Sequence, residues 1–137
     1  MMNNNFDDPE ARPPGERCLH LGPPLPTMTY SDGTHIQIIQ TDNYIVIYSE
    51  EAMQTRIVRL NGEHPPYMTR KWMKDSVGHW EADTLVIHTN GFHPEHTVSQ
   101  IASSAIFEVT ERISMTNWNE LLSVSYTHLT LPTIYSV

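Results

Sequence analysis

A chain of 137 residues with 39 % hydrophobic residues has room for one domain with a modest core, and no apolar run in it approaches the length of a membrane span. Eight basic and sixteen acidic residues give a formal net charge of −8. A surface of this sign repels phosphate backbones, which argues against nucleic acid and anionic membranes as partners. The single cysteine, Cys18, excludes an internal disulfide.

The N-terminal segment, residues 1–26, predicts an extended or disordered arm. It is rich in Asn, Asp, Pro and Gly and holds six of the ten prolines. Such a composition buries too little apolar surface to offset the entropy of ordering the chain. It also lacks the basic and apolar regions of a signal peptide. We therefore expect the β-domain to occupy residues 27–122.

Three stretches in the first half of this domain predict strands, at residues 35–40, 44–48 and 54–60. The second is apolar at every position and mostly β-branched or aromatic, which is typical of a strand covered on both faces, as inside a small closed barrel. A tight turn at Asn61-Gly62 ends the third. These three strands predict a meander.

A basic, aromatic run follows at residues 67–74, directly after Pro65-Pro66. The prolines exclude a central strand, so a short helical turn or a loop across one end of the sheet is expected. Trp72 could close the end of a barrel. Basic residues interleaved with Tyr and Trp can bind single-stranded nucleic acid, but with the net charge of −8 we expect a solvated rim.

The segment from Asp75 to Thr89 predicts a hairpin with a two-residue turn at Ala82 and Asp83. Side chains alternate along both strands, so two faces follow. We expect the Trp80 face to be the core. It carries Ser76, Gly78, Trp80, Leu85, Ile87 and Thr89, and the opposite face carries Val77, His79, Glu81, Thr84, Val86 and His88.

On that opposite face, His79 and His88 are diagonal neighbours, roughly 6 to 8 Å apart at the backbone, with Glu81 one step along. Such a trio could bind a metal or exchange protons near neutral pH. Two imidazoles without a fixed third ligand make an incomplete metal site, so we expect no metal and no cofactor. The pattern therefore favours a half-solvated polar face with two ordinary histidines over a metal or proton-exchange site.

The last predicted strands lie at residues 105–115 and from Glu120 onward. Phe107, Val109, Ile113 and Met115 share one face of the first, and Glu111 interrupts that face. Glu111 is therefore expected either at an exposed strand end or as one polar group of a lined cavity.

The residues from Ser76 to Ile87 resemble the pattern S-V-G-(H/R)-W-E-G-D-T-L-V-V of a large, uncharacterised bacterial family whose members are usually exported. The resemblance covers about residues 7–122. It implies an exported or periplasmic protein, although this chain shows no signal peptide. Further matches, in the family's order, are Cys18-Leu19, Gly22-Pro23, Gln40-Thr41, Tyr48, Glu50, Asn61-Gly62, Pro65-Pro66, Asn90-Gly91-Phe92 and Val109-Thr110-Glu111-Arg112.

This chain departs from the family pattern at three places. Ala82 stands where the family carries Gly, in a turn that usually needs positive φ. His88 stands where the family carries an acid that could pair with the basic residue at position 79. Residues 123–137 resemble translated sequencing-adapter read-through instead of the family, so we expect a non-native tail and a β-domain truncated at its C-terminus.

We predict an all-β fold, an antiparallel meander of seven or eight strands that forms a small lipocalin-like barrel, with an open β-sandwich as the alternative. Small barrels hold ligands inside or at the mouth. The leading hypothesis is a small-molecule-binding domain with a polar pocket near the 76–89 hairpin, formed from His79, Glu81, His88 and Trp72. The alternatives are a hydrolase, isomerase or lyase with a histidine general base, and an accessory domain without a pocket.

Overall fold

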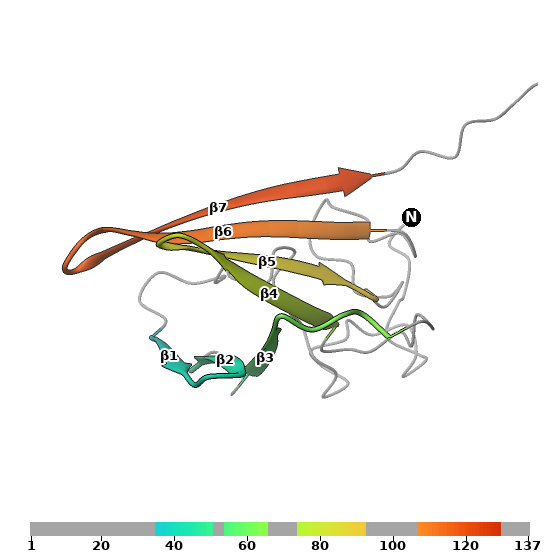
Figure 1. The fold of residues 1–137 in the computed structure, drawn as a ribbon, viewed down its shortest axis with the longest axis horizontal. Coiled ribbons are helices and arrows are strands. Elements are labelled where there is room, and N and C mark those ends of the chain that lie inside the picture. The colour runs from blue at the N-terminus through green and yellow to red at the C-terminus, as the bar shows by residue number, and fades with distance from the viewer. Residues whose placement is uncertain (1–34, 51–53, 66–73, 93–106, 130–137) are drawn as a thin grey trace, which may run out of the picture.

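The computed structural model describes residues 35–50, 54–65, 74–92 and 107–129 (Figure 1). They form strands and turns, and they contain no helix. The all-β prediction is confirmed. The strands are β1 Ile36–Gln40, β2 Tyr44–Ser49, β3 Gln54–Leu60, β4 Asp75–Glu81, β5 Thr84–Asn90, β6 Phe107–Asn117 and β7 Glu120–Leu129.

The seven strands form one sheet in which each strand pairs with its neighbour in the chain, from β1 at one edge to β7 at the other. The sheet curls into a half-barrel (Figure 1). One pair departs from the antiparallel prediction, because β3 and β4 run parallel over Val58–Leu60 and Ser76–Gly78. Residues 61–74 separate these two strands. A connection of this length can return the chain to the end of the sheet where β3 began, as parallel pairing requires.

The β4–β5 hairpin has the predicted register, with Glu81 opposite Thr84 and Val77 opposite His88. Gly78, Ile87 and Thr89 are buried on the predicted core face. Trp80 is the exception, since 45 % of it is exposed. It lies two positions before the turn, while its cross-strand partner Leu85 is buried on the same face.

The main core cluster lies on one face of the sheet, which we call the inner face, while Val86 is buried on the opposite face. This cluster joins strands β2, β3, β5 and β6 and consists of Ile45, Ile47, Val58, Leu85, Ile87 and Ile113, with Phe92 and Val109 forming a second cluster. Strand β2 buries only this face, because Tyr44 is exposed and Val46 and Tyr48 are half-buried. The prediction that β2 is covered on both faces is therefore wrong.

Two small residues determine the backbone geometry of the hairpin. A Cβ at Gly78 would lie 2.9 Å from Val58 Cγ1 and 3.1 Å from the Val86 carbonyl oxygen, so the parallel β3–β4 contact requires glycine there. Ala82 has a φ of 51°, as predicted for the first turn residue. An L-residue with a side chain adopts this φ at a cost of about 1 kcal/mol or more.

Strand β7 includes the first seven residues of segment 123–137, and its ladder with β6 runs from Glu120 to Leu129. The described side chains of residues 120–126 are exposed or half-buried, and none belongs to the two core clusters. The non-native origin of the segment stays a prediction. Over the described ranges, the structure has no helix long and apolar enough to cross a membrane.

Candidate functional site

A buried polar cluster interrupts the apolar inner face of the sheet. Four neighbouring strands each contribute one side chain to it, in the order Arg56 from β3, Ser76 from β4, Thr89 from β5 and Glu111 from β6. The registers place all four on the inner face, since Arg56 lies opposite Ile47 and Glu111 opposite Ile87. We call these four residues and Lys74 the inner cluster.

Arg56 forms hydrogen bonds to the other three strand residues of the cluster. Its Nε donates to Ser76 Oγ at 3.0 Å, and one terminal nitrogen donates to Thr89 Oγ1 at 2.7 Å and to a Glu111 carboxylate oxygen at 2.5 Å. The two hydroxyl groups also share a hydrogen bond of 3.0 Å. Glu111 is fully buried, with 0 % of its surface exposed. Of the two positions predicted for Glu111, the structure therefore excludes the exposed strand end.

Lys74 directly precedes β4, and Arg56 and Glu111 are the charged groups that act on its amine. Its φ is 61°, an unusual value for a residue with a long side chain. Its Nζ lies 4.9 Å from the centre of the Phe92 ring. Burial and the positive charge of Arg56 lower the pKa of Lys74 to about 7, against the opposing effect of Glu111. The prediction that the basic run forms a solvated rim is therefore wrong at Lys74.

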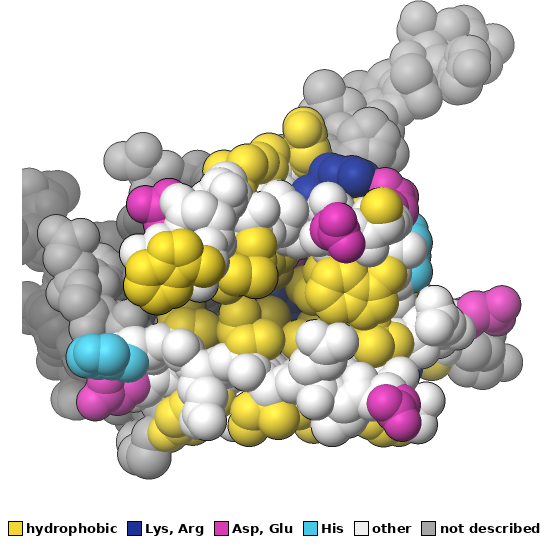
Figure 2. Space-filling model, turned by 60° about the vertical axis from the view of Figure 1, so that its left-hand side comes forward, with side chains coloured by type: hydrophobic (Ala, Val, Ile, Leu, Met, Phe, Trp, Pro, Cys, Tyr) yellow, Lys and Arg dark blue, Asp and Glu magenta, His cyan; other side chains and the backbone are white. Residues whose placement is uncertain are grey.

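Apolar side chains surround a hollow on the molecule, seen from the end at which the β4–β5 and β6–β7 turns lie (Figure 2). A basic side chain is visible between them. Five exposed apolar residues belong to the inner face by register, namely Ile36, Ile38, Trp80, Met115 and Leu121. The inner face thus combines a solvent-accessible apolar surface with the inner cluster.

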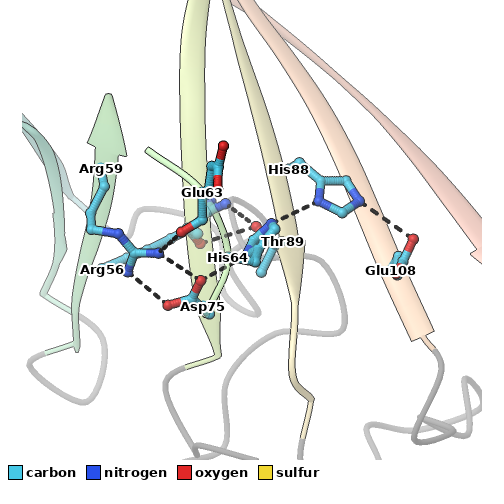
Figure 3. A network of polar contacts seen from close by, with 9 residues as sticks. Arg56, Arg59, Glu63, His64, Asp75, His88, Thr89 and Glu108 are labelled. Atoms are coloured by element: carbon cyan, nitrogen blue, oxygen red, sulfur yellow. Dashed lines mark hydrogen bonds and ion pairs between the residues drawn. The ribbon is translucent and has the colours of Figure 1, made fainter. Parts of the chain in front are cut away.

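The opposite face, which we call the outer face, carries a chain of polar contacts across β3 to β6 (Figure 3). Arg59 donates through two nitrogens to the Asp75 carboxylate, at 2.8 and 2.9 Å. His64 Nδ1 lies 2.6 Å from Asp75, and its Nε2 lies 2.8 Å from His88 Nδ1. His88 Nε2 lies 3.5 Å from a carboxylate oxygen of Glu108. We call these five residues the outer chain.

The protonation of the outer chain follows from Asp75. The guanidinium of Arg59 lowers the pKa of Asp75, and the hydrogen bond from His64 lowers it further against the effect of burial. An ionised Asp75 accepts a hydrogen bond from His64 Nδ1–H. If His64 is neutral, its Nε2 must then accept from His88 Nδ1. Every ring nitrogen of His64 and His88 therefore faces a protein partner.

The predicted site residues lie on the outer face or outside the described residues. His79 and Glu81 are in contact at 3.2 Å, and Arg112 donates to Glu81 at 2.7 Å. Arg112, followed by His79, lowers the pKa of Glu81. His88 instead contacts His64 in the outer chain. Trp72 lies outside the described residues, and the role of all four residues in ligand binding stays a prediction.

The sequence reasoning missed most of the inner cluster. Only Glu111 was noted from the sequence, because it interrupts an apolar strand face. A second signal was available, because Arg56 alternates with Val58 and Leu60 and so occupies an inner position of its strand. One acid and one base at inner positions of different strands favour a buried pair.

Within the described ranges, no group of three or more His, Cys, Asp or Glu side chains is placed to hold a metal ion. The resemblance to an exported bacterial family stays an expectation drawn from the residues. Comparison with family models, curated proteins and solved structures finds no match to this chain.

Proposed function

We propose that the inner face binds a small molecule with an apolar body and a carboxylate or similar anionic head. One observation carries this proposal, namely a buried group of charged and hydroxyl side chains in an otherwise apolar face. Ligand pockets have this composition, with apolar walls and a few placed polar groups that orient the ligand.

The stability of the fold does not account for the inner cluster. Removing two charges from water costs several kcal/mol for each ion, and apolar replacements for a buried ion pair are often neutral or stabilising by about 1 to 4 kcal/mol. Leu or Met at positions 56 and 111 would extend the core cluster that already includes Val58 and Ile87. A binding role gives a reason for charges where apolar residues would serve the fold as well.

Two basic side chains of the inner cluster, Arg56 and Lys74, support an anionic head. Burial and Arg56 together outweigh Glu111, because the pKa of Lys74 is lowered. The site thus disfavours a second cation beside Arg56. An anion in the hollow would offset this, and Arg and Lys side chains are the usual donors to carboxylates. The apolar rim of Ile36, Ile38 and Trp80 would contact the body.

A fluorescent fatty-acid probe tests the proposal. We expect dansyl-labelled undecanoic acid to bind the full chain, and its uncharged primary amide to bind more weakly. Lys74→Met and Arg56→Met should each weaken binding of the acid by at least about tenfold, the loss expected for a charge-assisted hydrogen bond. Arg112→Met, which removes an exposed arginine of the outer face, is the matched control and should bind like the unchanged protein.

The possible results test the anionic head and the binding itself separately. Equal affinity for the acid and the amide would contradict recognition of an anionic head. Binding of neither compound would contradict the proposal as a whole. Because Arg56→Met also breaks the buried pair, its fold is checked by circular dichroism, and Lys74→Met keeps the test decisive if Arg56→Met does not fold.

A further inference from the structure

We propose that the contact between His64 and His88 is an acid-sensitive latch. The latch is closed while one proton lies between the two facing nitrogens, and it opens once each of these nitrogens carries a proton of its own. It joins the segment after β3 to strand β5 on the outer face. The inference is therefore independent of the ligand proposed for the inner face.

The two rings are held so that one nitrogen of each faces the other. His64 Nε2 lies 2.8 Å from His88 Nδ1, and the rings meet edge to face at an angle of 67° with their centres 5.0 Å apart. At the outer ends of the pair, His64 Nδ1 lies 2.6 Å from Asp75 and His88 Nε2 lies 3.5 Å from Glu108 (Figure 3). Each ring thus lies between a carboxylate and the other ring.

The four ring nitrogens fit these contacts best with three protons. An ionised carboxylate can only accept, so each favours a proton on the nitrogen that faces it. One further proton between the rings completes the hydrogen bond at 2.8 Å. Three protons on two rings give the pair one positive charge, which lies between the carboxylates of Asp75 and Glu108.

A fourth proton does not fit the closed contact. Two N–H groups would face each other at 2.8 Å with no acceptor between them, and both rings would be positively charged. This distance leaves no room for a bridging water molecule, so the rings must separate. His64 keeps its ion pair with Asp75, and His88 keeps its ion pair with Glu108. The break therefore falls between the rings.

The other described charged groups around the pair hold its outer ends or are engaged elsewhere. Arg59 pairs with Asp75 through two nitrogens and lowers the pKa of that carboxyl, so Asp75 stays ionised while histidines titrate. By register, two groups lie diagonal to His88, and both contact the Glu81 carboxylate, namely His79 on β4 and Arg112 on β6. These surroundings leave the contact between the two rings to break in acid.

A shared proton makes the two rings titrate as a pair. The first additional proton is distributed over both rings, and the next binds only as the contact opens, so it requires a lower pH. The contact is therefore present above the second step and lost as the pH falls through it. Protonation of histidine clusters in mildly acidic surroundings changes contacts in this way in other proteins.

NMR spectroscopy of the full chain with isotope-labelled histidine tests the shared proton. The ring nitrogen signals are assigned through their bonds to the backbone and followed from about pH 8 to about pH 4.5, across the range in which histidines titrate. We expect His64 and His88 each to respond in two steps, separated by at least about one pH unit. The exposed His79, which pairs with Glu81, is the internal control and should titrate in one step.

Cross-relaxation between carbon-bound protons of the two rings measures the opening itself. We expect this signal to persist through the first step and to disappear after the second, because the ring centres lie 5.0 Å apart only in the closed contact. His64→Gln should leave His88 with a single step, whereas His79→Gln, the matched control, should leave both steps unchanged. A single, independent step for each ring in the unchanged protein would overturn the proposal. A ring contact that persists after full protonation would overturn it as well, and neither result depends on a variant that folds.

Discussion

Replacing Glu111 with Leu should destabilise the fold severely, because it leaves the Arg56 guanidinium buried without its carboxylate. Arg56 is 8 % exposed and Glu111 is 0 % exposed, so water cannot take over the lost contact. The hydroxyl groups of Ser76 and Thr89 would still accept hydrogen bonds from Arg56 but carry no charge. Breaking a buried pair on one side costs about 3 to 5 kcal/mol. For a domain of this size, that is a large part of the total stability.

The double variant Arg56→Met with Glu111→Leu should recover most of this loss. It removes both charges, and it leaves Ser76 and Thr89 hydrogen-bonded to each other at 3.0 Å. No buried charge then remains from the pair, and the two new side chains extend an apolar face. We expect its free energy of unfolding to equal that of the unchanged protein within about 1 kcal/mol, or to exceed it.

Urea unfolding followed by tryptophan fluorescence measures these differences, and unchanged m values would show that the denatured state is comparable. The control is the exposed Glu81–Arg112 pair, where Glu81→Leu with Arg112→Met should leave the midpoint unchanged. The reasoning would be refuted if the double variant were as unstable as the less stable single variant. A small loss in Glu111→Leu would also refute it.

Three further predictions concern the hairpin and the outer chain. Gly78→Ala should cost about 1 to 3 kcal/mol in thermal or urea unfolding, because its Cβ would lie 2.9 Å from Val58 Cγ1; an unchanged midpoint would contradict the close β3–β4 contact. Ala82→Gly should stabilise the fold by about 0.5 to 2 kcal/mol by relieving the positive φ, and a lower melting temperature would count against this. Asp75 has a lowered folded pKa, so its contacts stabilise the fold above the ordinary carboxyl pKa, and this stability is lost as the pH falls through the folded value. Urea midpoints between about pH 5 and pH 2 should therefore fall less steeply in Asp75→Asn than in the unchanged protein, and equal slopes would contradict the assignment.

The hairpin could be predicted from the sequence because its information is local. Alternation along residues 76–89 and a two-residue turn determine the register, and hence which side chains oppose one another. The position of Ala82 in the left-handed region followed from the same turn. Where burial depends on distant strands, as at Trp80, the local pattern gave the right face but the wrong degree of burial.

The inner cluster could not be predicted because it depends on contacts between strands that are far apart in the chain. Arg56 reaches Glu111 across β4 and β5, which requires the parallel β3–β4 pair and the curl of the sheet. No alternation rule predicts that pair, since it depends on how residues 61–74 return the chain. The same dependence on distant strands explains why Lys74 was predicted to be solvated like the rest of the basic run. Composition describes a run of residues, whereas the pKa of one amine depends on what packs around it.

The two polar networks differ in what they can offer a ligand, and this difference favours the inner face. In the outer chain, both nitrogens of His64 and of His88 face protein partners in series, so a substrate would have to displace a contact before it met a ring. That arrangement suits a structural tie between β3, β4, β5 and β6. The hollow is bordered by apolar side chains with a basic side chain visible between them, and an incoming group could enter it without breaking the ladder of the sheet (Figure 2). A general base on the outer face would therefore need a vacated imidazole nitrogen, while binding on the inner face needs only that the ligand match what already lines it.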